Sequence, residues 1–228
     1  MLHLDLSRSA EQVVKVGGGQ ANGRAHGVDR LERAGRRVRR EGVEILPWGD
    51  ATLSLRQRVS FLRQQGQDWP DLSSEALVAR LEDWLVPLLG KVRSLSTLSG
   101  ADLDGALRAL IPWDRQRTLD SAAPARWTAP TGNSFAIDYG AEAGPRVDVR
   151  VQETFGLTVH PTAGGVPLTL SLLSPGHRPI QTTRDLPGFW KGSWKDVRSD
   201  MRGRYPKHLW PEDPSVAVAT ARAKPRGT

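Results

Sequence analysis

The most informative chemistry in this 228-residue sequence is a run of basic side chains near its C-terminal end. The spacing i, i+4, i+7 and i+11 is shared by Lys191, Lys195, Arg198 and Arg202. Side chains at this spacing lie along one face of an α-helix, so the pattern predicts a basic stripe. Such a stripe can follow a phosphate backbone, which is the chemistry of nucleic-acid binding.

An apolar face runs beside the stripe, one position earlier in the sequence, and consists of Trp190, Trp194, Val197 and Met201. A tryptophan at helical spacing is more often part of a core than a stacking platform, so burial is the favoured interpretation for both tryptophans. The predicted nucleic-acid-binding set is Arg184, Lys191, Lys195, Arg198, Arg202, Arg204, Tyr205 and Lys207. In this set the lysines and arginines would contact phosphates and Tyr205 would offer a stacking face. The alternative is that some of these cations pair with Asp196 and Asp200.

The distribution of charge also indicates that the C-terminal part of the chain binds nucleic acid. The formal net charge is +7, and residues 176–228 hold 11 basic and 5 acidic side chains. A basic excess confined to one part of a chain is typical of a protein that binds a polyanion. A solvated basic tail is the alternative.

Residues for other chemistry are missing or wrongly spaced. There is no cysteine, which excludes disulfides and thiolate sites. The Gly18–Ala25 stretch approaches a phosphate-binding loop, but Arg24 replaces the lysine and Ala25 lacks the hydroxyl that would bind Mg²⁺. The five histidines are scattered. The sequence therefore predicts no catalytic residue, no metal site and no cofactor held by this chain.

Hydrophobic periodicity predicts how these residues are positioned. It changes from about 3.6 to about 2 near residue 124, which predicts an α+β protein. We expect a helical segment over 27–123, then a β-rich domain over 124–210 with a small antiparallel sheet or barrel and a basic helix over 188–203. Residues 1–26 are expected to be poorly ordered and 211–228 to form a loose tail. The predicted helices include 74–89, 102–110 and 113–120, with Ser73 as the N-cap of the first.

Neither a secretory signal nor a stretch of about 18 apolar residues is found in the sequence. Together with the absence of cysteine, this predicts a cytoplasmic protein without a membrane partner.

Several longer motifs resemble one known family. They are Leu46-Pro47-Trp48, Arg58–Leu62, Trp69–Leu72, Leu81–Leu85, Leu110–Trp113, Val151-Gln152-Glu153, Leu168–Leu170, Leu173–Pro175, Arg178-Pro179, Thr183–Leu186, Phe189-Trp190, Asp196–Arg198, Arg202–His208, Trp210-Pro211 and Asp213-Pro214. In this order they resemble the C-terminal region of HrpB-type ATP-dependent helicases, bacterial members of the DEAH-box class. The resemblance covers roughly residues 28–214.

The resemblance implies an accessory region of an RNA helicase that packs on the helicase core and holds single-stranded RNA. In the family, ATP and Mg²⁺ act in two tandem motor domains with a phosphate loop and a DEAH motif, and neither motif occurs in this sequence. The resemblance therefore implies a detached or truncated C-terminal part whose partners are RNA and, if encoded separately, the motor domains. The rival interpretation is a non-catalytic docking module that binds a protein partner and no nucleic acid.

We predict that the purified 228-residue chain has no RNA-stimulated ATPase activity, because the phosphate-cradling lysine and the Mg²⁺ ligands are missing. A phosphate-release assay with RNA present measures this. Turnover that co-purifies with the chain through a second column would contradict the prediction.

Overall fold

The computed structural model describes residues 21–90 and 94–222, and for residues 21–30 the backbone alone. The chain divides into two compact units, Met1–Leu119 and Asp120–Thr228. The expected poor order of residues 1–26 concerns mainly residues outside the described part. The described backbone begins as a helix at Ala21.

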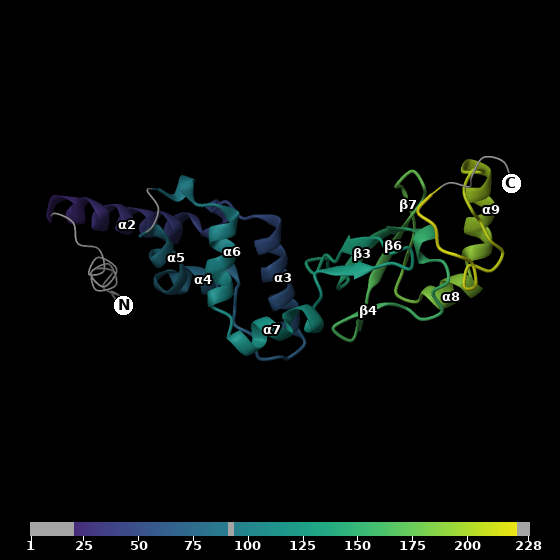
Figure 1. Cartoon of the computed structure of the whole chain (residues 1–228), viewed down its shortest axis with the longest axis horizontal. Helices are drawn as coiled ribbons and strands as arrows, with labels where there is room; N and C mark the ends of the chain where they lie inside the picture. Colours follow the sequence, from purple (N-terminus) through teal and green to yellow (C-terminus); the bar gives the residue numbers. More distant parts are fainter. Residues whose placement is uncertain (1–20, 91–93, 223–228) are drawn as a thin grey trace. The chain divides into compact units, whose positions relative to one another are not determined.

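The first unit is helical (Figure 1). Its elements are α2 (Ala21–Glu41), η1 (Val43–Ile45), α3 (Asp50–Gln64), α4 (Ser74–Ala79), α5 (Leu81–Leu89), η2 (Leu95–Thr97), α6 (Gly100–Ala109) and α7 (Trp113–Ala122), of which α7 continues into the second unit. The core forms where α3, α5 and α6 meet, and its fully buried side chains include Leu55, Leu62, Leu85 and Leu103. The prediction of a helical first half is confirmed.

The helix predicted over 74–89 is two helices that meet at Arg80. Ser73 is the N-cap of α4, as expected, and its hydroxyl accepts a hydrogen bond from the amide of Ala76 at 3.3 Å. In a continuous helix the carbonyl of Leu77 would accept from the amide of Leu81. It accepts instead from the amide of Arg80 at 3.3 Å and from the indole N–H of Trp84 at 3.0 Å. The buried tryptophan thus takes up a carbonyl that the helix break leaves without its usual donor.

The second unit contains β1 (Arg126–Thr128), β2 (Ser134–Ala136), β3 (Arg146–Arg150), η3 (Val151–Thr154), β4 (Thr162–Ala163), β5 (Val166–Pro167), β6 (Thr169–Leu173) and β7 (Pro179–Thr183). Strands β1–β2, β4–β5 and β6–β7 pair antiparallel, as predicted. Strand β3 pairs parallel with β6, so the expectation of an antiparallel sheet is wrong for this pair. The connection between β3 and β6 contains η3 and the short β4–β5 hairpin, and this long crossover makes a parallel pairing possible.

The C-terminal helix differs most from the prediction. The sequence pattern predicts one helix over 188–203, but the structure has α8 (Leu186–Lys191) and α9 (Trp194–Arg204). The break falls at Gly192 and Ser193, which are weak helix formers. At Gly192 a Cβ atom would lie 3.1 Å from the carbonyl oxygen of Gly188, so the break is also a place of close backbone approach.

Trp194 is the centre of the core beneath α8 and α9. Its side chain is 1% exposed. Its ring packs edge-to-face against Phe155, Phe189 and Trp190 and lies 6.0 Å from the ring of Trp210, measured between centroids. The indole N–H of Trp194 donates to the carbonyl of Pro211 at 3.0 Å. The interpretation of both helical tryptophans as core residues is confirmed, since Trp190 is also buried.

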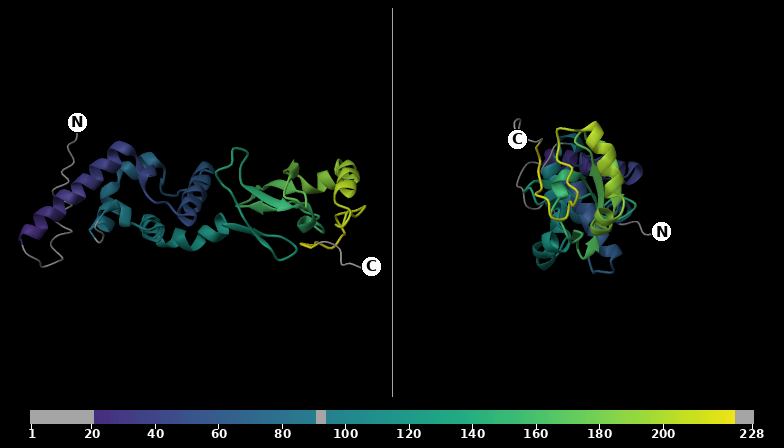
Figure 2. Two further views of the ribbon diagram at one scale, coloured as in Figure 1. Left: turned by 90° about the horizontal axis from the view of Figure 1, so that it is seen from above. Right: turned by 90° about the vertical axis from the view of Figure 1, so that its right-hand side faces the viewer.

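Residues 211–222 contain no helix or strand, but hydrogen bonds attach them to the rest of the unit. The carbonyl of Pro214 accepts from Gly156 N at 2.9 Å, and the amide of Thr220 donates to Gln152 O at 3.0 Å. In all views of Figures 1 and 2 this segment lies beside α8 and α9. Much of the tail that composition predicts to be loose is therefore attached, while residues 223–228 lie outside the described part. None of the described helices is both long and apolar enough to span a bilayer.

We expect Trp194→Ala to destabilise the second unit by about 3–5 kcal/mol, because it opens a cavity where five aromatic rings meet. Trp113→Ala is the matched control, since Trp113 is 72% exposed. Native-state hydrogen exchange of the β3 and β6 amides reports the stability of this unit alone. Similar effects of the two substitutions would contradict the central role of Trp194.

Candidate nucleic-acid interface

Four of the predicted cations are exposed on or beside α8 and α9. In the part of the chain that the structure describes, no ion pair or hydrogen bond engages the side chains of Lys191, Lys195, Arg202 and Lys207, and we call them the four free cations. Lys195 and Arg202 are two helical turns apart on α9 and so share a face. Arg184 is also exposed, with its guanidinium 3.5 Å from the carbonyl of Pro167.

The other two arginines of the predicted set are engaged within the protein. The Nε–H of Arg198 donates to the carbonyl of Trp210 at 3.0 Å, and its Nη2 lies 3.3 Å from a carboxylate oxygen of Glu212. Arg204 pairs with Asp200 at 3.0 Å, one turn earlier on α9. Arg198 therefore helps to attach the segment that follows α9.

The neighbouring carboxylates do not neutralise the four free cations. Asp185 caps α8, because its Oδ1 accepts a hydrogen bond from Gly188 N at 3.0 Å. Asp200 pairs with Arg204, whereas Asp196 is exposed. The alternative that some of the cations pair with Asp196 and Asp200 therefore holds for Arg204 with Asp200, and in the described chain it does not extend to the four free cations.

The predicted stacking residue, Tyr205, is half-buried just after α9. Its hydroxyl lies 3.3 Å from Ser174 Oγ at the end of β6, and its ring packs edge-to-face with His208. Tyr205 therefore lies apart from the exposed face of α9 and joins the end of this helix to the turn that follows β6.

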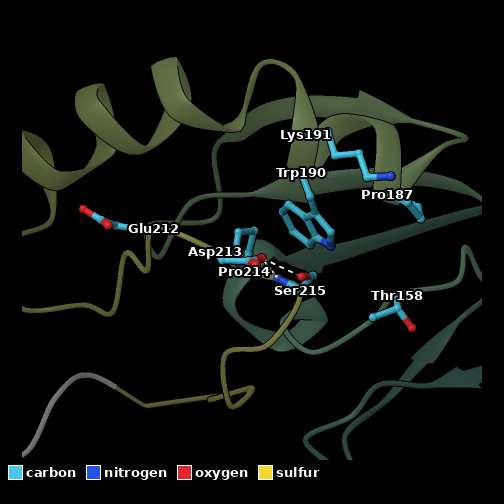
Figure 3. A pocket seen from close by; sticks show the side chains of 8 residues that line it. All are labelled: Thr158, Pro187, Trp190, Lys191, Glu212, Asp213, Pro214 and Ser215. Carbon is cyan, nitrogen blue, oxygen red and sulfur yellow. Dashed lines mark hydrogen bonds between the residues drawn. The ribbon is translucent and has the colours of Figure 1, made fainter.

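A pocket of about 490 Å³ lies beside Lys191. Its wall includes the ring of Trp190, and Pro187 and Pro214 add apolar surface (Figure 3). Glu212 and Asp213 also line it, and Asp213 accepts hydrogen bonds from the backbone and side chain of Ser215. These bonds lower the pKa of Asp213, so the carboxylate stays charged at neutral pH. Two carboxylates make this pocket unfavourable for a phosphate group.

A buried carboxylate in η3 organises a second pocket, which sequence reasoning missed. Glu153 is 1% exposed and accepts hydrogen bonds from Thr131 Oγ1 at 2.9 Å and Asn133 Nδ2 at 2.6 Å. Arg150 donates two more, through Nε at 3.1 Å and Nη2 at 2.8 Å. Burial alone would raise the pKa of Glu153, but the four hydrogen bonds and the charge of Arg150 outweigh it and lower the pKa. The i, i+3 spacing of Arg150 and Glu153 could have suggested the pair; the contact with the β1–β2 turn could not have been foreseen.

The described residues contain no group of three or more His, Asp or Glu side chains that could hold a metal ion.

Comparisons with known proteins agree with one another. Residues 84–214 match the family described as ATP-dependent helicase C-terminal, HrpB_C. The chain is 44% identical over 191 residues to the ATP-dependent RNA helicase HrpB of Escherichia coli strain K12. The match covers 82% of this chain and 24% of the helicase.

Two solved structures from Escherichia coli are similar. The DExH-box NTPase HrpB matches with a TM-score of 0.78 and 40% identity, covering 91% of this chain and 26% of the other. The DEAH/RHA helicase HrpB matches with a TM-score of 0.64 and 43% identity, covering 77% and 23%. The chain thus spans about a quarter of the length of these relatives.

We expect Glu153→Gln to destabilise the second unit by about 2 kcal/mol at pH 7, because charge-assisted hydrogen bonds are lost. The folded-state pKa lies below the ordinary 4.5, so this stabilisation is present above pH 4.5 and is lost as the pH falls through the folded-state value. Urea unfolding at several pH values should show the difference from wild type shrinking in that acidic range. Glu142→Gln, at an exposed position, is the control and should change little. A pH-independent difference would contradict the ionised role of Glu153.

Proposed function

Because this chain belongs to the family of HrpB-type ATP-dependent helicases, as their C-terminal region, we propose that it is an accessory region that contacts single-stranded RNA. The observation that carries the proposal is the set of four free cations, Lys191, Lys195, Arg202 and Lys207, which are exposed on α8, on α9 or just after α9 and have no hydrogen bond or ion pair in the described chain. Exposed cations of this kind exchange small counterions for phosphates, and this exchange provides the affinity.

The first unit has a different proposed role, which is to contact another protein domain. Trp113 at the start of α7 is 72% exposed, and Leu53 on α3 is 42% exposed. Exposed large apolar side chains are enriched at protein–protein interfaces. The relatives are about four times as long as this chain, so they contain segments that could cover these residues. We propose that this unit packs against the motor domains of a helicase.

A docking module without RNA contact is the second candidate. It is favoured by the pocket beside Lys191, where Trp190 and two prolines meet the carboxylates of Glu212 and Asp213. An apolar wall with negative charge suits a basic peptide better than a polyanion. The RNA-binding experiment separates this candidate from the first.

We predict that changing the four free cations to glutamine weakens RNA binding and reduces its salt dependence. If each cation contacts one phosphate, log K of the wild type falls against log[salt] with a slope of about −3, and the variant slope approaches zero. The measurement is a fluorescence titration with a short labelled RNA at several salt concentrations. Arg198 stays unchanged because it bonds to Trp210 O, so the variant should fold.

A control variant removes the same number of charges from the first unit, by changing Arg36, Arg37, Arg40 and Arg117 to glutamine. These side chains are exposed and far from α8 and α9 in sequence. The control should bind like wild type, apart from a small loss of long-range attraction. Equal affinities and slopes for wild type and the variant that replaces the four free cations would overturn RNA contact by those cations. That result would favour the docking module.

A further inference from the structure

The second pocket, of about 300 Å³, lies at the edge of the sheet in the second unit. It is lined by Phe135 of β2, Arg150 at the end of β3, Leu173 at the end of β6, His177 in the β6–β7 turn, and Asn133 with Glu153. Its volume is at the low end for ligand pockets, which suits one small planar group. None of these residues belongs to the basic stripe.

One wall of the pocket is aromatic. Phe135 is half-buried and lies directly opposite Trp127 in the antiparallel β1–β2 pair. Their ring centroids are 6.2 Å apart, with planes at 33°. Trp127 thus supports the phenyl ring, while the pocket leaves part of Phe135 open. A supported, partly open ring is a suitable surface on which a base can stack.

The polar groups around the pocket retain hydrogen-bonding capacity. Asn133 uses its Nδ2 for Glu153, and Arg150 uses Nε and Nη2 for the same carboxylate. Within the described chain, no hydrogen bond engages the side-chain oxygen Oδ1 of Asn133, the Nη1 of Arg150 or the imidazole of His177, whereas the backbone carbonyl of Asn133 accepts from Ala129 N. An amide carbonyl and a guanidinium are groups that hydrogen-bond to the edge of an unstacked base.

The charge of this pocket also differs from that of the pocket beside Lys191. Each of its two carboxylates is already paired, Asp148 with Arg146 at 2.8 Å and Glu153 with Arg150 at 2.8 Å. The exposed Arg178 follows His177 in the same turn. The pocket is therefore compatible with a nearby phosphate chain, whereas the pocket beside Lys191 contains Asp213, whose hydrogen bonds in the described chain come from Ser215 and not from a cation.

The end of α9 adjoins this pocket. The hydroxyl of Tyr205 lies 3.3 Å from Ser174 Oγ. Ser174 Oγ accepts from the amide of Arg178 at 3.1 Å, and Ser174 N–H donates to the carbonyl of Arg178 at 2.8 Å, so Ser174 is attached to the turn that carries His177. The pKa of His208 is lowered mainly by burial. The positive charge of the nearby Arg150 guanidinium lowers it further. Lys207, one of the four free cations, lies between Tyr205 and His208 in sequence.

We propose that this pocket holds one unpaired base of single-stranded RNA, stacked on Phe135, while the adjoining phosphates reach Lys207. The inference rests on the proposed RNA contact and adds to it a base-binding site on the sheet. If the inference is correct, the chain binds RNA more tightly when a base is present. Phosphate contacts alone do not produce such a dependence.

The test uses the full chain and two labelled RNAs of equal length, about ten nucleotides, within the range of single-strand site sizes. One is an oligouridine and the other has the same phosphates but abasic sugars. Wild type should bind the oligouridine about tenfold more tightly, the effect expected of one stacked base. Phe135→Leu keeps an apolar side chain without the aromatic face and should abolish this difference while leaving the abasic affinity unchanged. Trp113→Leu removes an exposed aromatic ring elsewhere, and this variant should retain the affinity difference between the two RNAs.

Two further measurements keep the proposal testable if Phe135→Leu fails to fold. His177→Asn tolerates the positive φ of 59° at this position and should weaken oligouridine binding severalfold. An oligomer carrying 5-iodouridine should photo-crosslink to residues that line the pocket in the wild-type chain. Equal affinity for both RNAs, or crosslinks confined to other regions, would overturn the base pocket but leave the phosphate contacts standing. Binding of neither RNA would overturn the proposed function itself.

Discussion

The burial of Trp194 is the constraint on which the C-terminal part of the protein depends. Its ring meets four other aromatic rings, and its N–H group holds the carbonyl of Pro211. Because Trp194 begins α9 and Trp190 lies in α8, packing both against Phe155 fixes which faces of the two helices turn inward. The outward faces then carry the lysines. The apolar core thus determines which cations can meet a ligand.

The cations of this region are divided between two tasks. Arg198 and Arg204 stabilise the fold through Trp210 O, Glu212 and Asp200. An arginine suits such contacts because its planar group donates in several directions at once. The free positions are mostly lysines, whose compact charge on a flexible stem can follow a phosphate backbone. The proposed RNA contact uses this second group.

Glu153 is a second organising residue of the same unit. A carboxylate buried without partners would be costly, and four hydrogen bonds make its charged form the stable one. Since the donors come from the β1–β2 turn and from β3, the ion holds the hairpin against the sheet. Phe135 and Asn133 are thereby placed beside Arg150 and His177. The proposed base pocket is a consequence of this buried charge.

Five features are predictable from the sequence: the α+β class, the helical first half, the cap at Ser73, the burial of both helical tryptophans and the basic character of the C-terminal part. These follow from periodicity, composition and local hydrogen bonding, which neighbouring residues decide. Long-range packing decides the parallel β3–β6 pairing, the attachment of residues 211–222 and the engagement of Arg198 with Trp210 and Glu212. Each depends on contacts between segments far apart in the chain, such as Trp194 with Pro211 and Glu153 with Asn133, and local propensity carries no information about them.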